Sequence, residues 1–191
     1  MANLASLMSD LETELPGIEA CRKQSAGYTS QFPMCSSISF ADVQSLRTKG
    51  RGKVYLIDTR TSEEREVSMV HEALSQKDFE ALDLDPEAEE NREATLIPYC
   101  TIGFRSGLYG KALVKQGWDN DRVRNGEGIV VFSYDSKLKL IDPSTGQEVN
   151  KMHVFGKDWD TAHSKYEAVV FGIWGQAKTI PATVAAMCAI S

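Results

Sequence analysis

Two short apolar segments constrain the fold of this chain more than any other feature. Residues 53–60 read KVYLIDTR and residues 94–100 read ATLIPYC. Both are nearly unbroken apolar runs, of the kind that a parallel sheet buries on both faces. Helical patterns lie at residues 39–50, where Ser39 can cap a helix with Phe40 and Val43 inward, and at residues 105–118. Strands that alternate with helices predict an α/β domain with a mainly parallel sheet.

Two places in this pattern need a more careful prediction. Pro98 lies inside the second strand, and because proline has no N–H to donate, that strand should lose pairing on one side near its end. Residues 128–132, GIVVF, have the periodicity of a strand, but a short strand at 121–124 followed by a helical turn fits the alternation better. Residues 141–148 predict a turn by composition.

Length and charge exclude several classes of protein. A chain of 191 residues is long enough for one domain with a real core. The formal net charge of −6 argues against nucleic-acid binding, and no apolar run is long enough to span a membrane. The amino terminus has neither signal-peptide nor transit-peptide character, so a cytoplasmic location is expected. Its leucine spacing instead predicts an amphipathic helix that docks on the domain.

The cysteines and histidines do not predict a metal site. Cys21, Cys35, Cys100 and Cys188 form no C-x-x-C pair, and the chain has three histidines. A structural zinc site of the usual spacing cannot be assembled locally, and we expect no metal and no cofactor. A disulfide framework has no motive in a chain of this size, which favours a reducing compartment.

The segment CTIGFRS, residues 100–106, follows the second strand and begins the next helix. The first N–H groups of a helix lack intrahelical partners, and a glycine at 103 lets the turn direct them inward as an anion-binding nest. With the charge of Arg105, such a loop should depress the pKa of Cys100 from its usual value of about 8.5 and make the sulfur nucleophilic. The alternative, that Cys100 is an ordinary buried thiol, stays open on these residues alone.

Two segments together resemble the rhodanese-like family. LIDTRTSEEREVSMVHEAL, residues 56–74, is similar to the family's D-x-R-(S/T)-x-x-E segment, and CTIGFRSG resembles its C-x-x-G-x-R-S loop. The similarity covers roughly residues 36–135. It implies a five-stranded parallel sheet with helices on both faces. It also implies a division into an amino-terminal helix and linker (1–35), the rhodanese-like domain (36–135) and a carboxy-terminal extension (136–191).

The resemblance also implies a sulfurtransferase. Cys100 would carry a sulfane sulfur as a persulfide, taken from thiosulfate or another persulfide and passed to cyanide or a thiol. Arg105 would attract the anionic donor, and Asp58 and Arg60 would brace the loop, with Arg60 paired to an acidic neighbour such as Glu64. The loop amides would hold the sulfur; they belong to Thr101, Ile102, Gly103, Phe104, Arg105 and Ser106.

Several positions depart from the family pattern or lie outside it. His71 and Glu72 replace a usual Pro-Gly and are expected to form a surface turn. Arg105 is the only cation of the loop, so thiosulfate is expected to bind weakly and the donor could be a less charged persulfide. The roles of the extension and of Cys188 are left open, as is a homodimer.

Two other functions remain as alternatives. A phosphatase or arsenate reductase of the same superfamily is disfavoured, because the related phosphatases have one more residue between cysteine and arginine than the loop from Cys100 to Arg105. A non-catalytic rhodanese-like binding module would usually lack the cysteine. Hydrolysis of a generic aryl phosphate would favour the first alternative, and normal partner capture by Cys100→Ser would favour a binding role, which could coexist with catalysis.

Overall fold

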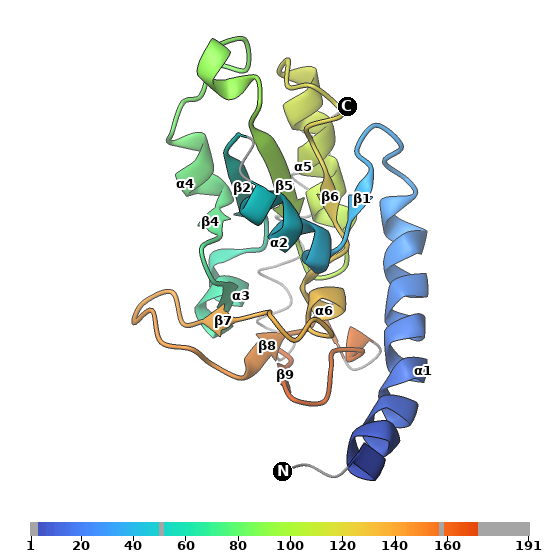
Figure 1. Cartoon of the computed structure of the whole chain (residues 1–191). Coiled ribbons are helices and arrows are strands. Elements are labelled where there is room, and N and C mark those ends of the chain that lie inside the picture. The colour runs from blue at the N-terminus through green and yellow to red at the C-terminus, as the bar shows by residue number, and fades with distance from the viewer. Residues whose placement is uncertain (1–3, 50–51, 157–158, 172–191) are drawn as a thin grey trace.

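The chain folds around a small parallel sheet with helices on both sides and one long helix along its flank (Figure 1). The structure is a computed structural model that describes residues 4–49, 52–156 and 159–171. Helix α1 (Leu4–Thr29) is the long flanking helix. It confirms the predicted amino-terminal helix, although the side chains of residues 4–16 lie outside the described part. No helix within the described ranges is both long and apolar enough to cross a membrane.

The two apolar segments form the centre of the sheet, as predicted. Strand β2 (Val54–Asp58) lies between β4 (Leu74–Ser75) and β5 (Thr95–Tyr99), and all three are parallel. β2 and β5 stay in register over their whole length, from Val54 beside Thr95 to Asp58 beside Tyr99. The prediction of an α/β domain with a parallel sheet is confirmed.

The described residues do not form the continuous five-stranded sheet that was expected. Strands β1 (Ser37–Ile38) and β6 (Asn125–Gly126) make a separate parallel pair. A single parallel bridge, Leu96 with Val123, connects β5 to the segment that leads into β6. Two hydrogen bonds form this bridge: the Leu96 N–H donates to the Arg122 carbonyl, and the Arg124 N–H donates to the Leu96 carbonyl. The ladder ends there because the next residue of β5 that would donate on this side is Pro98, which has no N–H. The predicted loss of pairing at this proline therefore accounts for the divided sheet.

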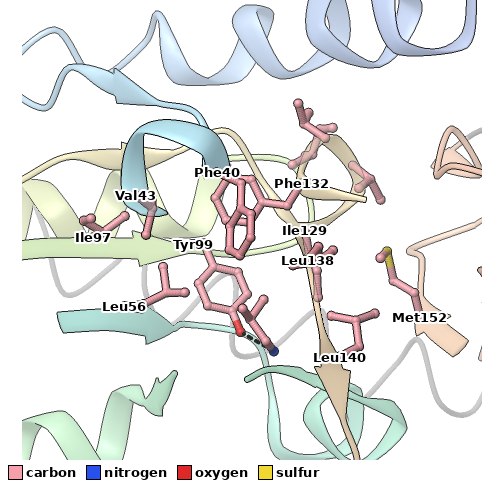
Figure 2. Packing of buried hydrophobic residues seen from close by; sticks show 14 of the residues in the cluster. Phe40, Val43, Leu56, Ile97, Tyr99, Ile129, Phe132, Leu138, Leu140 and Met152 are labelled. Carbon is pink, nitrogen blue, oxygen red and sulfur yellow. Dashed lines mark hydrogen bonds between the residues drawn. The ribbon is translucent and has the colours of Figure 1, made fainter. Parts of the chain in front are cut away.

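Helices cover both faces of the sheet, because alternate residues of its strands point to opposite sides. One face carries Leu56, Ile97 and Tyr99, which pack with α2 (Phe40–Lys49) and α6 (Ile129–Phe132). Figure 2 shows this cluster, with Phe40 and Phe132 beside Tyr99. The other face carries Ile57 and Leu96, which pack with α4 (Gln76–Glu80) and α5 (Phe104–Lys115).

Local sequence signals set the starts of three helices. The Ser39 hydroxyl accepts from the Asp42 N–H at the start of α2, as predicted. Thr61 caps α3 (Ser62–Val67) and forms a capping box with Glu64. Ser75 caps α4 in the same way, through Asp78. Residues 129–132 are helical, so the interpretation of a helical turn rather than a strand is confirmed.

The segment after residue 136 shares the core of the sheet domain. Strand β7 (Leu140–Ile141) pairs with β3 (Met69–Val70), and the predicted turn follows β7. Strand β8 (Lys151–His153) pairs in parallel with β9 (Glu167–Val169). Outside this segment, η1 (Glu89–Asn91) is a short 3-10 helix before β5. Leu140 and Met152 are fully buried in the cluster of Figure 2. The proposed domain boundaries stay a prediction.

A buried polar cluster fixes the carboxyl ends of β2 and β5. The Tyr99 hydroxyl donates to Asp58 Oδ2 over 2.6 Å and accepts from the Val70 N–H over 3.1 Å, the bond drawn in Figure 2. Arg60 Nη2 donates to Asp58 Oδ2 over 2.7 Å and to the Ser68 carbonyl over 2.7 Å. All of these side chains are shielded from water, so each bond satisfies a group that would otherwise be costly to bury.

Removing the Tyr99 hydroxyl should therefore destabilise the fold. Tyr99→Phe leaves the Val70 N–H without its partner and takes one donor from Asp58, and we expect a loss of roughly 1–3 kcal/mol in the free energy of unfolding. Urea denaturation measures this loss. Tyr55→Phe, at a partly exposed position of β2, is the matched control and should change stability by less than about 0.5 kcal/mol. Equal losses in the two variants would contradict the role assigned to the cluster.

Candidate active site

The loop between β5 and α5 bends back around the sulfur of Cys100. Cys100 follows β5 directly, and Gly103 caps α5 with a left-handed φ of 98°. This conformation is easy only for glycine, and it aims the Gly103 N–H at Cys100 Sγ over 3.1 Å. The Ser106 hydroxyl, one turn into the helix, also faces the sulfur at 3.5 Å. The predicted turn of donors around Cys100 is therefore present.

The surroundings of Cys100 lower the pKa of its thiol. Burial alone raises that pKa, but the charge of Arg105 and hydrogen bonds from the Ser106 hydroxyl and from the N–H groups of Ser106 and Ile102 outweigh it. The other described cysteines behave in the opposite way. Burial raises the pKa of Cys35 to about 11 and also raises the pKa of Cys21. Among the described thiols, Cys100 is therefore the one whose surroundings favour the thiolate.

Arg105 is held by a buried carboxylate. Its two terminal nitrogens donate to the two oxygens of Glu64, over 2.5 and 2.8 Å, and one of them also reaches Thr101 Oγ1 at 3.3 Å. The Glu64 side chain is fully buried and that of Arg105 is 11% exposed. This two-point pair fixes the plane of the guanidinium. Arg105 therefore lies beside the sulfur, but its hydrogen-bonding edge faces Glu64.

Glu64 connects three parts of the chain. Its carboxylate accepts from the Thr61 N–H over 2.9 Å as part of the capping box of α3. It binds Arg105 of α5, and His153 Nδ1 of β8 lies 3.1 Å from its Oε1. Burial raises the pKa of Glu64, but the hydrogen bonds and charge of Arg105, the nearby His153 and the charge of Arg60 outweigh it and hold that pKa well below its usual range. Glu64 is therefore a permanent carboxylate.

Arg60 is paired with an acidic neighbour, as expected, but that neighbour is Asp58 rather than Glu64. Arg60 is paired with Asp58 through Nε and Nη2, and Glu64 binds Arg105 instead. Asp58 is two residues from Arg60 at the buried end of β2, whereas Glu64 lies on α3. Asp58 is therefore the carboxylate that Arg60 reaches more easily. Asp58 and Arg60 act on the loop indirectly, by fixing Tyr99 immediately before Cys100. The direct brace of the loop is Glu64.

Three segments cover the loop. Ile129 of α6 donates its N–H to the Cys100 carbonyl over 2.9 Å, and Asn125 donates its side-chain amide to the Gly103 carbonyl over 2.9 Å. Helix α1 covers the glycine itself, because a Cβ at position 103 would lie 2.5 Å from Thr29 Cγ2. As a result Cys100 is only 2% exposed. It is buried, as the alternative of an ordinary core thiol requires, but its nearest neighbours are hydrogen-bond donors rather than hydrocarbon.

Aromatic contacts fix α1 in this covering position. The ring of Phe104, at the start of α5, lies 6.0 Å from the ring of Tyr28 and 5.8 Å from the ring of Phe32. The Ser25 hydroxyl adds a hydrogen bond of 2.6 Å to the Glu127 carbonyl, next to α6. The carboxy-terminal half of α1 therefore contacts both the loop, at Phe104, and the segment that precedes α6, at Glu127.

The sequence named Glu64 only as an expected partner of Arg60, and it indicated no role for His153. Glu64 closes the D-x-R-(S/T)-x-x-E segment, and its capping position beside Thr61 was the available signal. His153 lies outside both motif segments, and its place beside Glu64 depends on the path of β8. His71 and Glu72 form an exposed turn far from this chemistry, as expected, with Glu72 paired to Arg47. Cys188 lies outside the described residues.

The described residues contain no group of three or more His, Cys, Asp or Glu side chains arranged to hold a metal ion. The chemistry available to the loop is that of a sulfur anion among hydrogen-bond donors, next to an arginine whose charge is balanced by a glutamate.

Comparisons with known proteins give two loosely similar solved structures. No family model and no curated protein matches the chain. One structure is described as a protein of unknown function and possible tyrosine phosphatase from Rhodopseudomonas palustris; the match has 21% identity, a TM-score of 0.38 and covers 58% of this chain and 83% of that one. The other is a rhodanese-like domain protein from Staphylococcus aureus, with 20% identity, a TM-score of 0.39 and coverage of 55% and 96%.

The charge of Arg105 should be visible in the titration of Cys100. In Arg105→Gln the positive charge is lost while burial remains, so the pKa of Cys100 should rise. The rate of iodoacetamide alkylation at Cys100, followed by peptide mass spectrometry across pH, measures this shift. In the parent protein Cys100 should react at a lower pH than Cys35.

Two variants complete this titration experiment. Ser106→Ala removes one hydrogen bond to the sulfur with little change in volume, and should raise the pKa of Cys100 by less than Arg105→Gln does. Lys111→Gln, farther along α5, removes the same charge away from the loop and should leave the titration unchanged. An unaltered Cys100 titration in Arg105→Gln would contradict the proposed electrostatics.

Gly103 should tolerate no side chain while α1 is in place. Gly103→Ala combines the cost of a left-handed backbone, about 1 kcal/mol, with a collision against Thr29. Gly146→Ala is the matched control, because Gly146 also has positive φ but has open space around it. In urea denaturation Gly103→Ala should lose more stability than Gly146→Ala, and adding Thr29→Ala should recover part of the difference. Equal losses without recovery would show that α1 does not press on the loop.

Proposed function

We propose that this chain is a sulfurtransferase that carries a sulfane sulfur as a persulfide on Cys100. The observation that supports this most strongly is the opposite behaviour of its cysteines, since only the loop thiol among those described has its pKa lowered. A lowered pKa provides the thiolate that attacks a sulfane sulfur at neutral pH. The order of strand, cysteine, left-handed glycine and helix supplies the required donors around it.

The loading step exchanges one sulfur–sulfur bond for another. The Cys100 thiolate attacks the sulfane sulfur of a donor R–S–SH; a bond forms between Sγ and that sulfur, and the donor's S–S bond breaks. The products are Cys100–S–SH and the thiolate R–S⁻, so atoms and charge balance and no external oxidant is needed. In the second step the outer sulfur passes to an acceptor thiol or to cyanide, which restores the Cys100 thiolate.

The loop can stabilise the outer sulfur as it arrives. The N–H groups of Phe104, Arg105 and Ser106 belong to the first turn of α5, where helix geometry leaves them without intrahelical partners. Together with the Gly103 N–H they offer several donors around one negative atom. A single sulfur suits this short loop better than a tetrahedral phosphate does, since the phosphate has several oxygens to accommodate.

A donor reaches Cys100 only when part of the cover is displaced. Because Cys100 is 2% exposed, its sulfur cannot be contacted by a reagent larger than water in the closed arrangement. Helix α1 is the covering segment that crosses the glycine of the loop, and it is fixed there mainly by side-chain contacts. We infer that movement of its carboxy-terminal half precedes sulfur transfer.

The proposal is tested by the mass of the protein after exposure to a sulfane donor. Incubation with thiosulfate or with a small alkyl persulfide, followed by removal of the donor, should add the mass of one sulfur atom. The peptide that contains Cys100 should carry it, and cyanide should remove it as thiocyanate. Cys100→Ser should abolish loading, whereas Cys35→Ala should retain it, because the pKa of Cys35 is raised to about 11.

Other outcomes of this experiment would select another function. If no donor loads Cys100 and the protein hydrolyses an aryl phosphate, the phosphatase alternative is correct. If neither reaction occurs, a non-catalytic binding module is favoured. The acceptor, whether cyanide or a thiol, is distinguished by which of them discharges the loaded protein.

A further inference from the structure

The charge around Cys100 is not arranged to receive a doubly charged donor. Both terminal nitrogens of Arg105 are bound to the carboxylate of Glu64, which is fully buried. The Cys100 thiolate and Glu64 carry two negative charges against one positive charge on Arg105. With the thiolate formed, the immediate site therefore has a net negative charge.

The nearby arginine on β2 does not change this balance. Arg60 is fully buried, and its guanidinium donates to Asp58 through Nε and Nη2, so its charge is already matched by a carboxylate. His153 faces Glu64, with its Nδ1 3.1 Å from Glu64 Oε1, rather than the sulfur. Among the described residues the loop from 100 to 106 contains no basic side chain besides Arg105.

We propose that Glu64 is a specificity-determining residue, which makes the site select sulfane donors whose leaving group carries at most one negative charge. Persulfides R–S–SH and thiosulfonates are such donors, whereas thiosulfate, a dianion, is disfavoured. This inference rests on the proposed sulfurtransferase function. Its structural basis is that Glu64 uses both hydrogen-bonding positions of Arg105 that would otherwise bind the sulfonate oxygens of thiosulfate.

Two donors differ by almost nothing except this charge. Thiosulfate gives its sulfane sulfur to the Cys100 thiolate and leaves as sulfite, SO₃²⁻. Methanethiosulfonate, CH₃SO₂S⁻, gives the same sulfur and leaves as methanesulfinate, CH₃SO₂⁻. In both reactions one S–S bond forms at Sγ and one S–S bond breaks in the donor, and the product on the protein is the persulfide anion. Methanethiosulfonate has a methyl group where thiosulfate has a charged oxygen.

The experiment compares kcat/KM for these two donors with cyanide as acceptor, at one fixed pH for both donors. The parent protein should prefer methanethiosulfonate over thiosulfate by about tenfold or more, the effect of one additional like charge beside a buried carboxylate. Glu64→Gln retains the shape and removes the charge, so it should shift this ratio toward thiosulfate by a similar factor. Glu66→Gln, on the exposed side of the same helix, is the matched control and should leave the ratio unchanged.

Each outcome either supports or overturns the inference. Equal use of the two donors by the parent protein, or a preference for thiosulfate, overturns it, and this comparison needs no variant. If Glu64→Gln folds by circular dichroism and keeps the parent ratio, the role of Glu64 is wrong. If neither donor places sulfur on Cys100 in the parent protein, the sulfurtransferase function itself fails, which is distinguishable from a failure of donor selection.

Discussion

The buried ion pair between Glu64 and Arg105 is the interaction on which the site depends. It joins the capped start of α3 to the first turn of α5, and His153 brings β8 against the same carboxylate. A buried charge is tolerable only when it is paired and hydrogen-bonded, and here each charge has several partners. Because Arg105 is fixed from this side, its charge lies beside Cys100 in a constant position. The loop can then be rigid without any contact between Glu64 and the sulfur.

Burial and hydrogen bonding oppose each other at Cys100, and the structure determines which effect prevails. Cys21, Cys35 and Cys100 are all buried, and burial alone raises a thiol pKa. The charge of Arg22 also acts on Cys21, but burial prevails there, whereas at Cys100 the charge of Arg105 and several N–H or O–H donors together outweigh burial. The closed cover strengthens this effect, because charges interact more strongly where water is excluded. Burial at this position is therefore compatible with a reactive sulfur, provided that the cover can open.

The sequence predicted those parts of the fold and site that depend on neighbouring residues. Strands β2 and β5, the cap at Ser39 and the glycine turn after Cys100 follow from local patterns, and even the divided sheet follows from the missing N–H of Pro98. The partners of the arginines could not be predicted in this way. Which carboxylate meets Arg60 or Arg105 depends on how β2, α3 and α5 pack, and the position of His153 depends on β8, which no motif identified.

Access to the site and its charge are controlled from opposite sides of the loop. Helix α1 approaches through Thr29 at Gly103 and through Tyr28 at Phe104, and Phe32, just after the helix, also contacts Phe104. Glu64 approaches from α3 and holds Arg105 through hydrogen bonds that involve no residue of α1. Displacement of α1 would therefore expose the sulfur without releasing Arg105 from Glu64. An open site would keep the charge balance of the closed one, so donor selection would be a property of the loop and its brace rather than of the cover.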